Sequence, residues 1–162
     1  LDRFLVRIQM EYPGKETELG ILRLHSGMMS AAAEENGQGK GWAGMPEPVT
    51  SAERILELRG LLADVYADPA ILEYVVEIAR LTREHPDLAL GASPRASLFL
   101  FQCARARALL QSRHYTTHED VMAVALPVLG HRLILRPEAE VEGRRVSDIV
   151  SETLGKIPVI RR

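Results

Sequence analysis

The sequence GASPRASLFLFQCARARALLQSR, from Gly91 to Arg113, carries the signal that decides the fold of this chain. Ser93 is a favourable N-cap residue, and Pro94 follows at the first helical position, where the missing N–H of proline costs nothing. The rest of the segment is apolar almost all round, which is typical of a helix in the centre of a bundle. We therefore predict a central helix that begins at Ser93 and Pro94.

Arg95 falls in the first turn of this predicted helix. The N-terminus of a helix carries about half a positive charge, so a cation at this place is mildly unfavourable. A guanidinium beside free backbone N–H groups becomes favourable when an anion binds between them, and phosphate is the usual anion. The alternative is that Arg95 points into water or pairs with a nearby glutamate.

The composition is that of an ordinary globular protein. The chain has 162 residues, of which 46% are hydrophobic and 26% are charged, and its formal net charge is −2. This balance gives no general attraction to nucleic acid or to an anionic membrane, and no apolar run approaches the eighteen or so residues of a membrane span. We expect a cytoplasmic setting. Cys103 is the only cysteine, which excludes an internal disulfide and predicts a packed thiol.

Five further segments show helical periodicity or helix caps, and proline and glycine residues separate them. They are residues 15–25, 50–66, 69–85, 117–128 and 146–157. Leu133–Leu135 is interpreted as a turn that extends the fourth of these helices, and residues 138–145 as a polar linker. The sequence therefore predicts about six helices.

Residues 1–12, LDRFLVRIQMEY, alternate apolar and mostly polar residues with the period of a strand, and Pro13 and Gly14 end the pattern. No other convincing strand follows, and a single strand lacks ladder partners. The chain also begins with Leu1 rather than methionine. We therefore expect a fragment of a longer protein. The predicted fold class is all-α, a helical bundle with one N-terminal strand left over from a missing α/β core.

A Gly-rich loop is predicted at about residues 28–48, with a disordered middle and with Trp42 anchoring its far end to the bundle. Its GQGKG segment lacks the GxxxxGK[ST] spacing of a phosphate-binding loop. His114 and His118 lie on either side of a predicted helix start and have no partner cysteines, so we predict no metal site. No basic recognition helix is present, which argues against nucleic-acid binding.

Four stretches together resemble the C-terminal half of a MoxR-type AAA+ ATPase. They are LDRFLVRIQMEYP at 1–13, GASPRA at 91–96, VLGHRLILRPEAEVEG at 128–143 and the closing IPVIRR. The resemblance implies that residues 1–14 are the last strand of the AAA+ core and that residues 15–162 are the helical lid subdomain. The Walker A and Walker B motifs and the sensor-1 residue of that family are absent from this chain.

The resemblance also implies functional residues. Arg95 matches the sensor-2 arginine, which reaches from the lid to the γ-phosphate, with Ser93 and Pro94 beside it. Arg3, in the LDRF motif, matches the arginine finger offered to the ATP of a neighbouring subunit. Tyr12 and Pro13 lie where the core meets the lid, near the adenine pocket of the family. ATP and Mg²⁺ would be bound by the full-length protein, and neither by this fragment alone.

The favoured hypothesis is thus a nucleotide-sensing lid of a homo-hexameric ATPase. Its partners would be the AAA+ core of the same chain, the neighbouring subunits and proteins with von Willebrand A domains, which such machines remodel in the manner of chaperones. One alternative is a helical protein-interaction module without a nucleotide role, and a second is a nucleic-acid binder. Substitution of Arg95 separates the first two.

Overall fold

The computed structural model describes residues 2–26 and 48–158, and it divides the chain into two compact units. One unit comprises Leu1–Ile8 with Glu53–Arg162, and the other comprises Gln9–Ala52. The elements are α1 (Lys15–His25), α2 (Ala52–Leu61), the 3₁₀ helix η3 (Leu62–Asp64), α3 (Pro69–Glu84), β1 (Leu88–Leu90), α4 (Pro94–Leu110), α5 (His118–Leu129), β2 (Ile134–Leu135), α6 (Pro137–Val141) and α7 (Val146–Lys156). The predicted Gly-rich loop, with Trp42, falls almost wholly outside the described residues.

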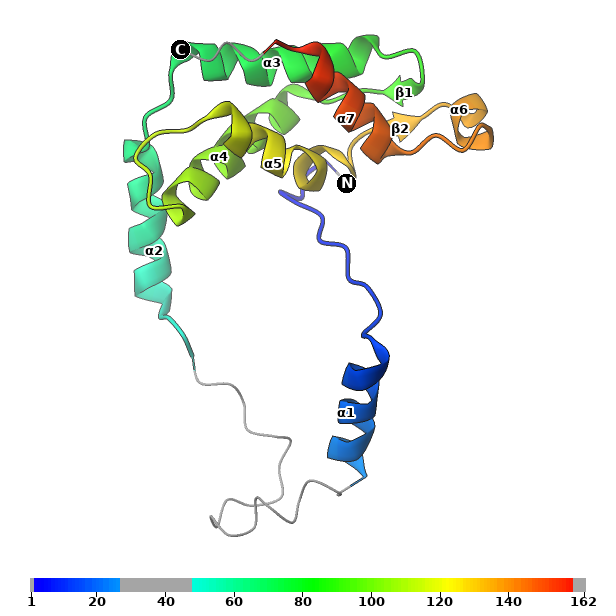
Figure 1. Cartoon of the computed structure of the whole chain (residues 1–162). Coiled ribbons are helices and arrows are strands. Elements are labelled where there is room, and N and C mark those ends of the chain that lie inside the picture. Colours follow the sequence, from blue (N-terminus) through cyan, green and yellow to red (C-terminus); the bar gives the residue numbers. More distant parts are fainter. Residues whose placement is uncertain (1, 27–47, 159–162) are drawn as a thin grey trace. The chain divides into compact units, whose positions relative to one another are not determined.

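The larger unit is a helical bundle built around α4, as the sequence predicts (Figure 1). The face that α4 buries carries three alanines and one leucine at every fourth position: Ala96, Leu100, Ala104 and Ala108. Small side chains at this spacing let the neighbouring helices approach closely, and α5 and α3 pack against α4. A shared hydrophobic core joins α3, α4, α5 and α7, so the predicted all-α bundle is confirmed.

The helix starts follow the predicted caps. The side chain of Asp68 accepts a hydrogen bond from Ala70 N at 2.9 Å, and that of Ser93 accepts one from Ala96 N at 3.2 Å. Thr117 and Asp120 form a reciprocal capping box at the start of α5. On α3, the buried face includes Ile71, Val75 and Ile78, whereas Leu72 and Val76 are exposed.

A short antiparallel sheet appears where the sequence predicts no strand. β1 pairs with β2, with Leu88 opposite Leu135 and Leu90 opposite Ile134. The run Leu133–Leu135 is therefore not a helical turn, since part of it pairs with the chain that leads into α4. This pairing joins residues more than forty positions apart, which local periodicity does not detect. The predicted polar linker after it contains the short helix α6.

The predicted strand at residues 1–12 is not observed within the described residues 2–12. Residues 2–5 form turns and a bend, and residues 6–12 have no regular structure. The main-chain link to the bundle is the Arg7 N–H, which donates to Pro127 O at 2.9 Å near the end of α5. No strand in the described part of the chain lies beside this segment, so the alternating pattern has no ladder to join. The smaller unit contains α1, which buries no residue.

Candidate functional site

The start of α4 is held in place by the last turn of α3. Thr82 Oγ1 donates to Ala79 O at 2.7 Å and accepts from Ala92 N at 3.0 Å, and Arg83 Nε donates to Ala92 O at 2.7 Å. Gly91 passes so close to α3 that an added Cβ would lie 2.6 Å from Arg83 Cα. The backbone that leads into Ser93 is therefore fixed on both sides.

Arg95 lies in the first turn of α4 and is exposed. Its guanidinium makes no hydrogen bond or ion pair with the described part of the chain, so the alternative of a glutamate partner is not observed there. Ser93 and Pro94 precede it as N-cap and first helical residue. An exposed guanidinium beside a helix N-terminus is an arrangement that can hold an anion.

A hollow of about 460 Å³ opens beside this helix start. Its lining includes Arg83, Gly91, Ser93, Pro94, Asp2 and Arg132. The Asp2 carboxylate is the one acidic side chain on its wall, and Arg95 is not among the lining residues. Among the described residues, no group of three or more His, Cys, Asp or Glu side chains could hold a metal ion.

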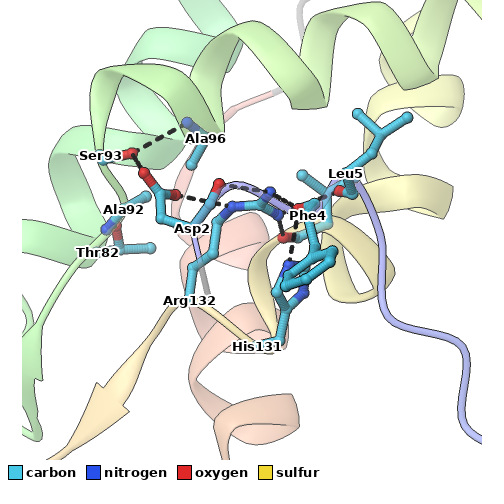
Figure 2. Close-up of polar contacts among 10 residues, drawn as sticks. Asp2, Phe4, Leu5, Thr82, Ala92, Ser93, Ala96, His131 and Arg132 are labelled. Carbon is cyan, nitrogen blue, oxygen red and sulfur yellow. Dashed lines mark hydrogen bonds and ion pairs between the residues drawn. The ribbon is translucent and has the colours of Figure 1, made fainter.

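The Asp2 carboxylate connects the N-terminal segment to the N-cap of α4 and to the turn that follows α5 (Figure 2). Ser93 Oγ donates to Asp2 Oδ2 at 2.9 Å, and Arg132 Nε donates to Asp2 Oδ1 at 3.0 Å. Burial alone would raise the pKa of Asp2, but these hydrogen bonds and the positive charges of Arg132 and Arg95 lower the pKa below its ordinary value. Asp2 is therefore ionised at neutral pH, and the N-cap of α4 is bonded to a charged group.

Arg132 is a buried arginine, with only 2% of its side chain exposed. Beyond Asp2 Oδ1, its guanidinium donates to the carbonyl oxygens of Asp2 at 3.3 Å and of Leu5 at 3.2 Å, and also to those of Phe4 and Val128. It lies over the ring of Phe99 on α4, 5.0 Å from the centroid. These contacts satisfy a charge that would otherwise be costly to bury.

Arg3 lies inside the segment that Arg132 holds. It is exposed, and its guanidinium lies 5.4 Å from the centroid of the Phe4 ring. His131 Nε2 donates to Phe4 O at 3.0 Å, so the residue next to Arg132 contributes to the same attachment. The structure thus brings the backbone around Arg3 and the start of the Arg95 helix into one unit.

Tyr12 and Pro13 belong to the smaller unit, and both are exposed, Tyr12 to 97%. No role was predicted for Asp2 or Arg132, although both make the hydrogen bonds that join the N-terminal segment to the bundle. The available signal was their position inside LDRF and GHRL, two of the stretches that carry the family resemblance.

Arg105 and Arg107 interrupt the apolar sequence of α4, are partly exposed and have partners in the bundle. Arg105 Nη2 donates to Ala63 O at 2.5 Å, and Arg107 Nη1 donates to the buried carboxylate of Asp120 at 2.8 Å.

No helix among the described residues is both long enough and apolar enough to cross a membrane.

Comparison with known proteins gives related sequences and a related structure. Residues 80–153 match the AAA lid domain family. YeaC, an uncharacterized protein of Bacillus subtilis, is 39% identical over 99% of this chain and 47% of its own length. The chaperone MoxR1 of Mycobacterium tuberculosis is 33% identical over 85% of this chain and 35% of its own length.

Among solved structures, the crystal structure of a candidate ATPase from Cytophaga hutchinsonii superposes with a TM-score of 0.81 at 29% sequence identity. That match covers 99% of this chain and 48% of the other. The chain spans half or less of the length of each of these proteins.

Proposed function

This chain carries the AAA lid domain of a MoxR-type AAA+ ATPase, and from that premise we propose that it senses bound nucleotide and couples neighbouring subunits during ATP-driven remodelling of partner proteins. The observation that supports nucleotide sensing is Arg95. It is an exposed guanidinium in the first turn of α4, and it makes no hydrogen bond or ion pair with the described part of the chain, although its charge acts on the Asp2 carboxylate.

The proposed role of Arg95 follows from the charge that develops on a transferring phosphoryl group. A guanidinium can donate two parallel hydrogen bonds to phosphate oxygens, and the helix N-terminus adds positive potential at the same place. In phosphoryl transfer, catalysis depends mainly on positioning and on electrostatic stabilisation of this kind. Ser93 and Pro94 would set the direction of the helix start, and the contacts of Thr82 and Arg83 would keep it rigid.

ATP with Mg²⁺, bound by the AAA+ core of the full-length protein, would supply the phosphoryl group. Arg95 would contact its γ-phosphate from the lid of the same subunit. Arg3 would extend to the nucleotide of the neighbouring subunit in a homo-hexamer. Movement of the lid with nucleotide state would then change the contact between subunits.

The remodelling role rests on similarity alone. One relative is named as a chaperone, and we extend that role to this chain as part of the proposal. The partners would be the core of the same chain, neighbouring subunits and proteins with von Willebrand A domains, in a cytoplasmic setting. Tyr12 and Pro13 would lie near the adenine, as the family resemblance implies.

The test is Arg95→Ala in the full-length protein. We expect kcat for ATP hydrolysis to fall by about 10²- to 10³-fold, because removal of one donor that stabilises transition-state charge has an effect of roughly this size. Arg80→Ala is the matched control, since Arg80 is an exposed arginine of α3 that lies 3.8 Å from Glu84. Hydrolysis that is unchanged in Arg95→Ala would favour a helical interaction module without a nucleotide role.

A further inference from the structure

The side chain of Arg3 makes few contacts that could fix its position. Its side chain is exposed, lies over the ring of the next residue, Phe4, and makes no hydrogen bond or ion pair with the described residues. The segment around it is not a strand, so no sheet ladder fixes its backbone. Whatever positions Arg3 must therefore act on the main chain on either side of it.

Arg132 makes those main-chain contacts. Its guanidinium donates to the carbonyl oxygen of Asp2, just before Arg3, and to those of Phe4 and Leu5, just after it. Its Nε also binds the Asp2 side chain at 3.0 Å. Because Arg132 is itself anchored to Val128 O and stacked on Phe99, it forms a fixed support for this turn of the chain.

We propose that Arg132 is a positioning residue for Arg3. Arg132 holds Arg3, the proposed arginine finger, in the orientation needed to reach the nucleotide of the neighbouring subunit. The inference rests on the proposed function, in which Arg3 acts on a nucleotide across the subunit boundary. Arg132 does not touch that nucleotide. It determines where the Arg3 side chain starts, and a displacement of about 1 Å in a reacting group can lower a rate by roughly 10²-fold.

The contacts also explain why this residue is an arginine. A planar guanidinium presents five N–H donors in a fixed fork and stays charged, so it can bind several carbonyls and a carboxylate at once. A lysine has one nitrogen and cannot span the same set of acceptors. Arg132→Lys should therefore lose ATP hydrolysis as Arg132→Gln does, although lysine keeps the positive charge.

The test uses mixed assemblies of the full-length protein. In the proposed mechanism, Arg95 serves the site of its own subunit and Arg3 serves the site of the next one. Subunits with Arg95→Ala and subunits with Arg3→Ala, each inactive alone, then form some complete sites when mixed, and hydrolysis rises well above that of either variant. Arg132→Gln should behave as Arg3→Ala does. It should lower kcat by about 10²-fold, be rescued by mixing with Arg95→Ala, and not be rescued by mixing with Arg3→Ala.

Each other result has a definite meaning. Rescue of Arg132→Gln by Arg3→Ala would overturn the proposal, because the defect would then lie in the subunit's own nucleotide site. Rescue by neither variant would also overturn it, because the defect would then lie in the fold of the subunit. If Arg95→Ala and Arg3→Ala both hydrolyse ATP normally, the proposed function fails instead. Wild-type hydrolysis by Arg132→Gln alongside impaired Arg3→Ala would overturn only the positioning role.

Two further variants distinguish a loss of positioning from a folding defect. Asp2→Asn removes the charge that Arg132 binds but leaves the carbonyl contacts, so it should give a smaller loss with the same pattern of rescue. Arg144→Gln is the control, since Arg144 also bridges acidic residues, Asp87 and Glu152, but has no contact with residues 2–5. It should leave kcat within twofold of the wild type in every mixture.

Discussion

Arg132 Nε lies 3.0 Å from Asp2 Oδ1, although the two residues are 130 positions apart in the chain. The same carboxylate accepts a hydrogen bond from the N-cap residue of α4, Ser93. Near the end of α5, Pro127 O and Val128 O accept from Arg7 N and from Arg132. Carbonyls in the last turn of a helix have no intrahelical partner, so Arg7 attaches the N-terminal segment by satisfying one of them, and Arg132 satisfies another.

This attachment can be tested without measuring activity. In Arg132→Gln, we expect amide hydrogen exchange at Arg7 to accelerate about tenfold or more, because a hydrogen bond to a charged group contributes roughly 1.5–3 kcal/mol. The Gly130 amide, which donates to Leu126 O within α5, should keep its protection. Arg136→Gln, a change at a nearby exposed arginine, is the control. Unchanged exchange at Arg7 in Arg132→Gln would show that Arg132 does not hold the segment.

A second prediction concerns the approach of α3 to the start of α4. In Gly91→Ala, the new Cβ would lie 2.6 Å from both Arg83 N and Arg83 Cα and 2.7 Å from Thr82 O. These are backbone atoms that cannot rotate away, so α3 or the start of α4 must move. We expect a loss of about 1–3 kcal/mol in the free energy of unfolding, measured by urea denaturation.

The matched change is Gly155→Ala. Gly155 lies within α7, is exposed, and has no atom within 4 Å of an added Cβ. Alanine is favoured over glycine in a helix, so this variant should gain about 0.5–1 kcal/mol. A Gly91→Ala protein as stable as the wild type would mean that the close approach to α3 is not rigid.

The parts of the fold that could be predicted are those in which the interacting residues are neighbours in the sequence. Ser93 caps α4 by accepting a hydrogen bond from the N–H of Ala96, three residues later. Thr117 caps α5 by accepting one from the N–H of Asp120, also three residues later. The central position of α4 followed from its apolar composition, because such a helix has no face suited to water. The exposed position of Arg95 is compatible with either interpretation of that residue.

The parts that could not be predicted depend on distant residues. The pairing of Leu88 with Leu135 and the contacts of Arg132 with Asp2 have no local pattern. The same limit applies to residues 1–12, where an alternating sequence forms a strand only if another strand lies beside it, and the described part of this chain supplies none. The contact of Arg107 with Asp120, which lies on another helix, likewise has no local pattern in the sequence.

The last prediction concerns that buried carboxylate. Asp120 is fully buried, and it accepts hydrogen bonds from Arg113 at 2.5 and 2.7 Å, from Arg107 at 2.8 Å and from Thr117 N at 2.9 Å. Burial alone would raise the pKa of Asp120, but the bonds from Arg113, Thr117 and Arg107 outweigh it and lower the pKa to about 2. The ionised form is therefore bound more strongly in the folded state than in the unfolded chain.

The sign of the pH dependence follows from this shift. An unfolded aspartate titrates near pH 3.9, so the contribution of Asp120 is fully present above about pH 4 and is lost as the pH falls towards 2. The loss should be roughly 2 kcal/mol in the free energy of unfolding, measured by denaturant titration across this range.

Asp120→Asn should remove this part of the pH dependence and cost about 3 kcal/mol at neutral pH, because Arg107 and Arg113 then lack their charged partner. Asp64→Asn, a change at an exposed aspartate of η3, should do neither. If the stability of Asp120→Asn fell between pH 4 and 2 as steeply as that of the wild type, other carboxylates would account for the acid sensitivity, and the α4–α5 junction would not depend on this charge.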